Sequence, residues 1–313
     1  MEELTQTLEA LRVGTPVASA NLTMVPLLTG QPTAPDYLLL DDALDAGLAE
    51  VTEISEGGSV PELVFSNRSE RDVLLVDGEE LVGAKQNRVL NLTILVAAGQ
   101  RTTIPVSCVE AGRWAWRTQR FASGRRKLHA AARMAKMRGV SASLRETGSR
   151  ARGDIQSEVW RAVDAKLRAF ACRSETAALH DVYDSAEQRL QPIRSAFAAQ
   201  PRQVGAVFFI DGKPAGLELF DAEHTLAKLL PKLVDSYAFD ALESADETAQ
   251  GAPSLTDVRA LLARIAAAPR TCYPSVATGT DVRIEDDALH GAALCARRRL
   301  VHLSALCADR QAQ

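Results

Sequence analysis

The chain from Asp77 to Asn91 concentrates carboxylate, ammonium, guanidinium and amide side chains between two segments rich in β-forming residues. Counting alternate residues back from a predicted strand over 89–96 places Lys85, Asn87 and Asn91 on one face of a sheet. An ammonium group and two carboxamides on one face can bind a polyhydroxyl or phosphate ligand, because the ammonium carries charge and the amides both donate and accept hydrogen bonds. The spacing therefore predicts a binding site for such a ligand.

A second polar cluster follows the next predicted strand, at Glu110, Arg113 and Trp114. Consecutive strands usually pair, so we expect this cluster to lie beside the first. A carboxylate from each cluster, with Arg113 on a phosphate and Trp114 on a base or sugar face, suits glycosidic or phosphoester hydrolysis. A simpler alternative is an ion pair between Glu110 and Arg113 that only holds a loop.

These residue types define a set of expected roles. The candidate general acids or bases are Glu79, Glu80 and Glu110. The candidate ligand-binding residues are Lys85, Gln86, Asn87, Arg88, Asn91, Arg113 and Trp114. Magnesium held by the carboxylates together with a substrate diphosphate is a further option. A third alternative is that the polar side chains form a buried network that only pins the sheet.

The spacing of histidine and cysteine predicts neither a transition-metal centre nor a disulfide framework. No two of the five histidines fall at HxH or HxxxH spacing, and the five cysteines are an odd number spaced far apart. Cys108 has His129 in the basic segment after it and is an alternative nucleophile. Alternation nevertheless places Cys108 on the face of Ile104 and Val106, which favours a small buried hydrophobe.

Positive charge is concentrated in one segment of an acidic chain. The net charge of the 313 residues is −4, yet residues 113–152 contain twelve Lys or Arg and one acid, Glu146. Such a segment predicts a site for an anion, which can be a nucleotide, nucleic acid or an acidic partner. The alternative is that the segment folds over the acidic surface of its own chain.

Hydrophobic spacing predicts an α+β fold. Short β-like runs separated by Gly, Asn and Asp make the N-terminal half an antiparallel sheet or sandwich. A helical middle, a second β-hairpin with a helix, and a small α/β C-terminal segment follow. The predicted divisions are a domain over 1–243 with β-rich (20–120), basic (113–152), helical (153–200) and hairpin-plus-helix (203–243) parts, a linker at 244–254, and a C-terminal segment at 255–313.

Four blocks of sequence resemble a known family. They are Gly78–Leu81, Gly83–Asn91, Ile104–Glu110 and Gly112–Trp114. These blocks resemble the ARG and rhodanese-phosphatase-superfamily-associated protein family, where ARG stands for ADP-ribosylglycohydrolase, and the resemblance covers about residues 21–241. It implies a link to ADP-ribose or NAD-derived nucleotide metabolism, with no established reaction.

The sequence therefore favours a protein that binds, with or without hydrolysis, ADP-ribose or an NAD-derived nucleotide at the two polar clusters. The alternative from another class is a noncatalytic module that binds nucleic acid or an acidic partner through residues 113–152. No apolar run approaches the roughly 18 residues of a membrane-spanning helix, and the N-terminus lacks the basic and apolar regions of a secretory signal. We therefore expect no membrane partner and a cytoplasmic location.

Overall fold

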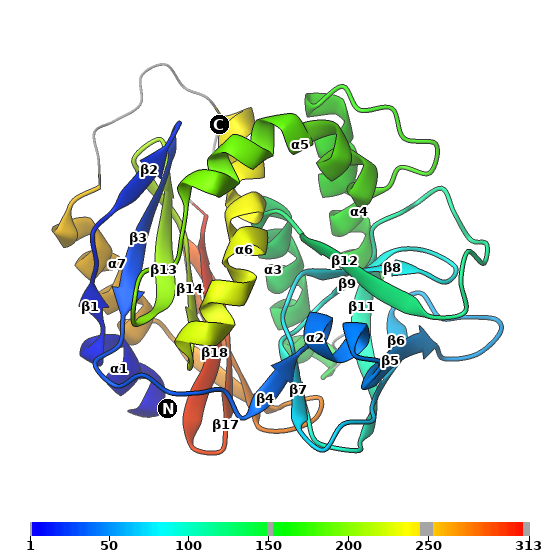
Figure 1. Cartoon of the computed structure of the whole chain (residues 1–313), viewed down its shortest axis with the longest axis horizontal. Helices are drawn as coiled ribbons and strands as arrows, with labels where there is room; N and C mark the ends of the chain where they lie inside the picture. The colour runs from blue at the N-terminus through cyan, green and yellow to red at the C-terminus, as the bar shows by residue number, and fades with distance from the viewer. Residues whose placement is uncertain (1, 149–152, 245–252, 309–313) are drawn as a thin grey trace. The chain divides into compact units, whose positions relative to one another are not determined.

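The computed structural model describes residues 2–148, 153–244 and 253–308. Its helices and mostly antiparallel strands confirm the predicted α+β class (Figure 1). The chain divides into two compact units, one made of residues 1–35, 189–274 and 279–313, the other of residues 36–188 and 275–278. No helix in the described ranges is long and apolar enough to cross a bilayer.

The first unit is built on a nine-stranded antiparallel sheet. Its path runs β1 (Arg12–Val13), β3 (Leu22–Leu28), β13 (Gln203–Ile210), β14 (Lys213–Phe220), β18 (Arg299–Cys307), β17 (Leu289–Ala296), β16 (Thr280–Asp286) and β15 (Arg270–Pro274), with β2 (Val17–Ser19) paired to β3. The predicted hairpin is β13–β14, and its turn residues Asp211 and Gly212 have φ of +50° and +74°. Such φ values at both central residues suit a tight hairpin turn.

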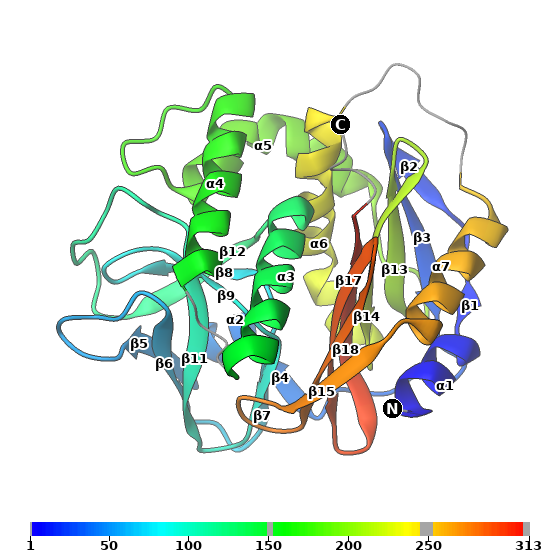
Figure 2. The ribbon, with the colours of Figure 1, turned by 180° about the vertical axis from the view of Figure 1, so that it is seen from behind.

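Three helices cover this sheet. They are α1 (Glu2–Ala10), α6 (Glu223–Glu243) and α7 (Leu255–Ala267). Helix α6 contacts β3, β13 and β14, whereas α1 and α7 lie side by side (Figure 2). Apolar residues of α1 and α7, among them Leu4, Leu8, Leu261 and Ile265, join those of the strands in one buried cluster.

The second unit contains a six-stranded antiparallel sheet. Its order is β12 (Phe121–Lys127), β8 (Glu79–Gly83), β9 (Arg88–Leu90), β11 (Arg101–Cys108), β6 (Glu62–Asn67) and β5 (Ala49–Glu53). The edge strands β5 and β12 contact each other, and Arg120 forms an ion pair with Glu50 of β5. The sheet therefore curls toward a barrel, and an inner and an outer face are distinguished along each strand.

Smaller elements complete the second unit. They are a three-stranded sheet of β10 (Ile94–Val96), β7 (Asp72–Leu75) and β4 (Tyr37–Leu39), and the helices α2 (Leu40–Asp45), α3 (Ala130–Thr147), α4 (Gly153–Ala169) and α5 (Leu179–Ala196), the last of which belongs to this unit up to Gln188. Helix α4 packs on α3 and reaches β11, where the Gln156 side chain bonds both backbone groups of Cys108.

The structure bears on two predictions about the organisation of the chain, namely one strand and the linker with its flanking domain boundaries. The strand predicted over 89–96 is divided into β9 and β10, which belong to different sheets. At the break, Lys136 Nζ donates to the carbonyls of Leu90 and Asn91. The linker predicted at 244–254 lies mostly outside the described residues. The boundaries 1–243 and 255–313 stay a prediction, although β18 of the C-terminal segment pairs with β14 in one sheet.

Candidate functional site

The structure brings the two predicted polar clusters together. The backbone N–H of Asn87 donates to Glu110 Oε2 at 3.0 Å, and Gln86 Nε2 donates to the Glu110 carbonyl at 3.0 Å. Arg113 Nη2 also donates to Asn87 Oδ1 at 3.1 Å. The bend between β8 and β9 is thus bonded directly to the segment that follows β11.

Glu110 is occupied by this internal network. Its oxygens accept from Arg113 Nε at 2.8 Å, Arg113 Nη2 at 2.6 Å and Thr176 Oγ1 at 2.8 Å. Burial raises the pKa of the Glu110 carboxyl, but the hydrogen bonds from Arg113, the Asn87 backbone and Thr176 outweigh it and hold the pKa below its usual value. This geometry agrees with the alternative in which Glu110 and Arg113 hold a loop.

The single binding face predicted from alternation does not form. Residues 84–87 are not a strand, and Ala84 has φ of +40°, so alternation ends at Arg88. Lys85 Nζ instead donates to the Gly57 carbonyl at 2.9 Å, while Asn91 Oδ1 accepts from Ser107 Oγ at 2.8 Å. Lys85 and Asn91 therefore serve different contacts, because one bend in the backbone resets the direction of the side chains.

The inner face of the curled sheet carries an incompletely paired arginine. Arg88 is fully buried on β9, and its Nη1 donates to Gln86 Oε1 at 2.9 Å. Its Nη2 lies 4.0 Å from Oε1 of Glu53 on β5, across the intervening strands β6 and β11. Within the described chain, Arg88 Nε and Nη2 and Glu53 Oε2 have no hydrogen-bond partner. Burial lowers the pKa of the Arg88 guanidinium.

This arrangement of buried charged side chains destabilises the fold unless a ligand binds to them. A buried polar group without a hydrogen bond destabilises a fold by roughly 1–3 kcal/mol. The Nε and Nη2 groups of a guanidinium form one edge of its planar fork, which matches two oxygens of a phosphate or carboxylate. Arg88 is among the binding residues that the sequence predicts. Glu53 is not, because Glu53 and Arg88 lie far apart in the sequence.

Aromatic side chains and a cavity lie close to Arg88 and Glu53, at one end of the curled sheet. Trp114 and Trp116 are 47% and 42% exposed, and Lys85 Nζ lies 5.3 and 5.2 Å from their ring centroids. The Arg88 guanidinium carbon is 5.6 Å from the Trp114 ring. A cavity of about 370 Å³ reaches Glu53 and is lined by Glu50, Thr52, Glu53, Ser55, Glu56, Trp116, Gln119 and Arg120. We call Arg88, Glu53, Lys85, Trp114, Trp116 and this cavity the barrel-end site.

Cys108 belongs to the same inner face, and its buried surroundings do not favour an activated thiol. It pairs with Arg88 between β11 and β9, so the two side chains share a face. Burial is the largest influence and raises the pKa of the Cys108 thiol, which keeps it protonated. The geometry therefore agrees with the buried-hydrophobe interpretation of Cys108.

The remaining predicted carboxylates face other partners. Glu79 Oε2 accepts from the Val76 N–H at 2.9 Å, across a turn in which Gly78 has φ of +78°. Glu80 is fully buried, and its Oε2 lies 3.1 Å from His180 Nδ1. Glu80 pairs with Val89 whereas Arg88 pairs with Leu81, so Glu80 is on the outer face of the sheet.

The Glu80–His180 pair combines a buried acid with an accessible base. The His180 side chain is 37% exposed, and its Nε2 lies 3.7 Å from Asp184 Oδ2. Burial raises the pKa of the Glu80 carboxyl, and the hydrogen bond to Glu80 raises the pKa of His180. Sequence reasoning missed His180, since it lies a hundred residues from Glu80 and no local motif marks it.

The basic segment pairs largely with acids of the same chain. Lys127, Arg133 and Lys136 surround the buried carboxylate of Asp77. Burial alone raises the pKa of Asp77, but these three cations together lower it far below its usual range. At the surface, the pairs are Arg120–Glu50, Arg125–Asp45 and Arg126–Glu187. This agrees with the alternative in which the segment folds over its own acidic surface.

No group of three or more His, Cys, Asp or Glu in the described ranges is arranged to hold a metal ion. The predicted carboxylates Glu79, Glu80 and Glu110 each contact a different partner. The described geometry thus lends no support to a magnesium ion shared by them.

The fold and these sites define an α+β protein with a curled six-stranded sheet whose end is polar and aromatic. A family model described as the ARG and Rhodanese-Phosphatase-superfamily-associated Protein domain matches residues 10–306. The chain belongs to this family, as its sequence blocks indicated, and the match extends through the C-terminal strands that the resemblance did not cover. No curated protein and no solved structure matches the chain.

Proposed function

We propose that the barrel-end site binds an anionic nucleotide of the ADP-ribose type. The observation that supports this most is the buried guanidinium of Arg88, whose Nε and Nη2 lack hydrogen-bond partners within the described chain. Two oxygens of a diphosphate would satisfy both groups at once. The family name associates the domain with ARG, which makes ADP-ribose the first ligand to test.

The other groups of the site suit the remaining parts of such a ligand. The exposed indole rings of Trp114 and Trp116 offer faces on which an adenine base can stack. Glu53 Oε2 lacks a partner within the described chain and can accept a hydrogen bond from a ribose hydroxyl. Lys85 adds positive charge between the two rings.

We propose binding ahead of hydrolysis, because most of the expected acids are engaged elsewhere. Glu79 and Glu110, two of the expected acids, are engaged with the backbone, Arg113 and Thr176. Glu80 lies on the opposite face of β8 from the barrel-end site. Hydrolysis would therefore depend on Glu80 together with His180, whose side chain is accessible to solvent.

Titration calorimetry with ADP-ribose, NAD and AMP tests the proposal, with and without magnesium. Replacing Arg88→Lys retains the charge but removes the fork, and should weaken binding about tenfold or more, because a hydrogen bond to a charged group contributes about 1.5–3 kcal/mol. Trp116→Ala, at an exposed position, should weaken binding by about fivefold to a hundredfold, since a stacked base contributes about 1–3 kcal/mol.

Arg125→Gln is the matched control, because Arg125 is exposed and, among the residues that the structure describes, its side chain pairs only with Asp45. It should leave nucleotide affinity unchanged, whereas binding of nucleic acid through the basic segment would fall in this variant and fall steeply with salt. Thermal melts of each variant establish that it is folded. The proposal is wrong if none of the three nucleotides produces heat with the wild-type chain.

A further inference from the structure

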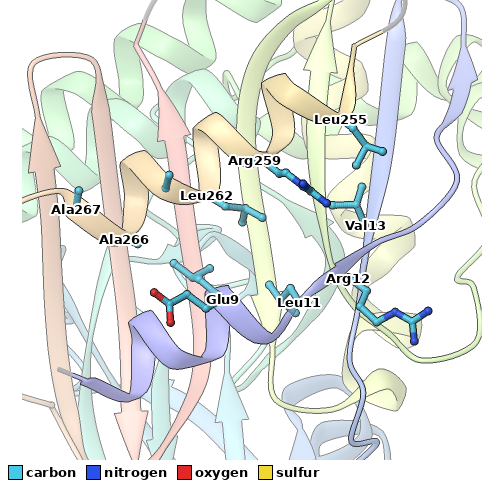
Figure 3. Close-up of a pocket in the computed structure, with 11 residues that line it drawn as sticks. Glu9, Leu11, Arg12, Val13, Leu255, Arg259, Leu262, Ala266 and Ala267 are labelled. Carbon is cyan, nitrogen blue, oxygen red and sulfur yellow. The ribbon is translucent and has the colours of Figure 1, made fainter.

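An open apolar groove lies in the first unit, between α1 and α7. Its volume is about 780 Å³, and both helices and the start of β1 contribute to its walls (Figure 3). Leu8, Leu11, Val13 and Leu262 supply apolar surface, and Leu11 and Val13 pack against the buried core of the unit. Leu255 stands at one end and is 55% exposed.

The gap exists because small side chains face it. On α7 the lining positions after Leu262 are Ala263, Ala266 and Ala267, which leave space that a larger residue would fill. The volume falls within the range of roughly 300–1,000 Å³ that is usual for sites of small molecules. An apolar wall with a few polar groups is also the usual composition of such sites.

Charge is placed unevenly around the groove. Arg12 and Arg259 lie toward the end marked by Leu255 and Val13, whereas Glu9 lies further toward Ala266 (Figure 3). Neither guanidinium makes a hydrogen bond or ion pair within the part of the chain that the structure describes. An apolar trough that ends at two cations with no partner among the described residues is complementary to a molecule with an apolar tail and a negative head.

We infer that this groove binds a single-chain anionic amphiphile, of the class of a medium- or long-chain carboxylate. The tail lies along the alanines of α7, with Leu8 of α1 and Leu11 after it, and the head reaches Arg259 and Arg12. The 13 residues of α7 extend over about 20 Å, a length similar to that of a saturated chain of a dozen or more carbons. The site is separate from the barrel-end site and does not depend on it.

Calorimetry with dodecanoate below its micelle-forming concentration tests the inference. We expect one dodecanoate per chain, binding by dodecyltrimethylammonium at least about tenfold weaker, and no measurable binding of acetate. Equal binding of the two dodecyl compounds would overturn the role of the arginines. Binding that begins only at micelle-forming concentrations, or binding to anionic vesicles without binding of the monomer, would overturn the site.

Paired variants on α7 locate the ligand. Ala263→Trp fills the groove and should reduce dodecanoate affinity at least about tenfold, whereas Ala260→Trp, also at an exposed alanine but outside the groove, should not. Arg259→Glu should weaken dodecanoate binding by a similar factor and favour the cationic compound, and Arg298→Glu, at another exposed arginine, is its control. Equal affinity in all four variants would contradict the inference.

Discussion

The most informative residues of this protein are buried charged side chains whose partners come from distant parts of the chain. Arg88 and Glu53 approach to 4.0 Å without a direct hydrogen bond, while Glu110 and Asp77 are surrounded by cations. An isolated buried charge is destabilising, and a paired one approximately balances its desolvation cost. This difference separates Arg88, which we assign to ligand binding, from Glu110, whose partners are internal.

His180 gives a prediction at the level of one side chain. Its pKa is raised above the ordinary value of 6.5 by the hydrogen bond to Glu80. The charged form therefore stabilises the folded state fully below pH 6.5, and this contribution is lost as the pH rises through the raised pKa. Because the imidazole is 37% exposed, solvent screening limits the contribution of its charge to the free energy of unfolding to about 0.5 kcal/mol, as for exposed ion pairs.

Melting temperatures of the wild type and His180→Asn between pH 6 and pH 9 check this. The wild type should melt higher by a degree or two near pH 6, and the difference should narrow toward pH 9. His224→Asn, at an exposed histidine, should show no such pH dependence. A difference that widens with pH would contradict the assignment.

At the scale of the element, β12 is shaped around Glu80. Its pairing with β8 changes register between Ser123 and Lys127, and Arg125 has φ of +52°, as in a β-bulge. A Cβ at Gly124 would overlap the Glu80 carboxylate and lie 3.0 Å from Glu80 Cβ. The bulge and its glycine therefore make room for the Glu80–His180 contact.

Gly124→Ala should accordingly destabilise the protein by about 1–3 kcal/mol, as overpacking of a buried site does. Chemical denaturation followed by circular dichroism measures the change. Gly30→Ala is the control, because no atom would lie within 4 Å of the added methyl group. Equal stability of the two variants would show that Gly124 is not constrained by Glu80.

Local sequence signals predicted elements better than side-chain directions. The hairpin of β13 and β14 follows from its Asp211-Gly212 turn, and the amphipathic helices follow from their apolar spacing. The convergence of the two polar clusters followed from the pairing of consecutive strands. The direction of Lys85 did not, because the backbone bend at Ala84 interrupts alternation. Glu53 and His180 were missed, since the curl of the sheet brings Glu53 near Arg88 and the position of α5 brings His180 to Glu80.

At the scale of the whole molecule, pairing between distant segments holds each unit together. In the first unit β18 lies between β14 and β17, so strands from both ends of the sequence share one sheet. We predict that a chain ending at residue 243 loses the cooperative unfolding of this unit, because β14 is left without its partner and α7 is removed from the core cluster. Calorimetric melting of the truncated chain, with the full chain beside it, checks this.

A truncated chain that shows a sharp melting transition for residues 1–35 and 189–243, as well as one for the second unit, would contradict that prediction. It would instead support the predicted domain over 1–243. The second unit offers an internal control, since all of its described strands lie between residues 36 and 127 and are retained in the truncated chain.

The binding proposal rests on Arg88, and a crystal structure with ADP-ribose tests it most directly. We predict two oxygens of the ligand within hydrogen-bond distance of Arg88 Nε and Nη2, with the adenine against Trp116 or Trp114. A structure in which Glu53 closes onto Arg88 through two direct hydrogen bonds, and the nucleotide is bound elsewhere or not at all, would contradict it.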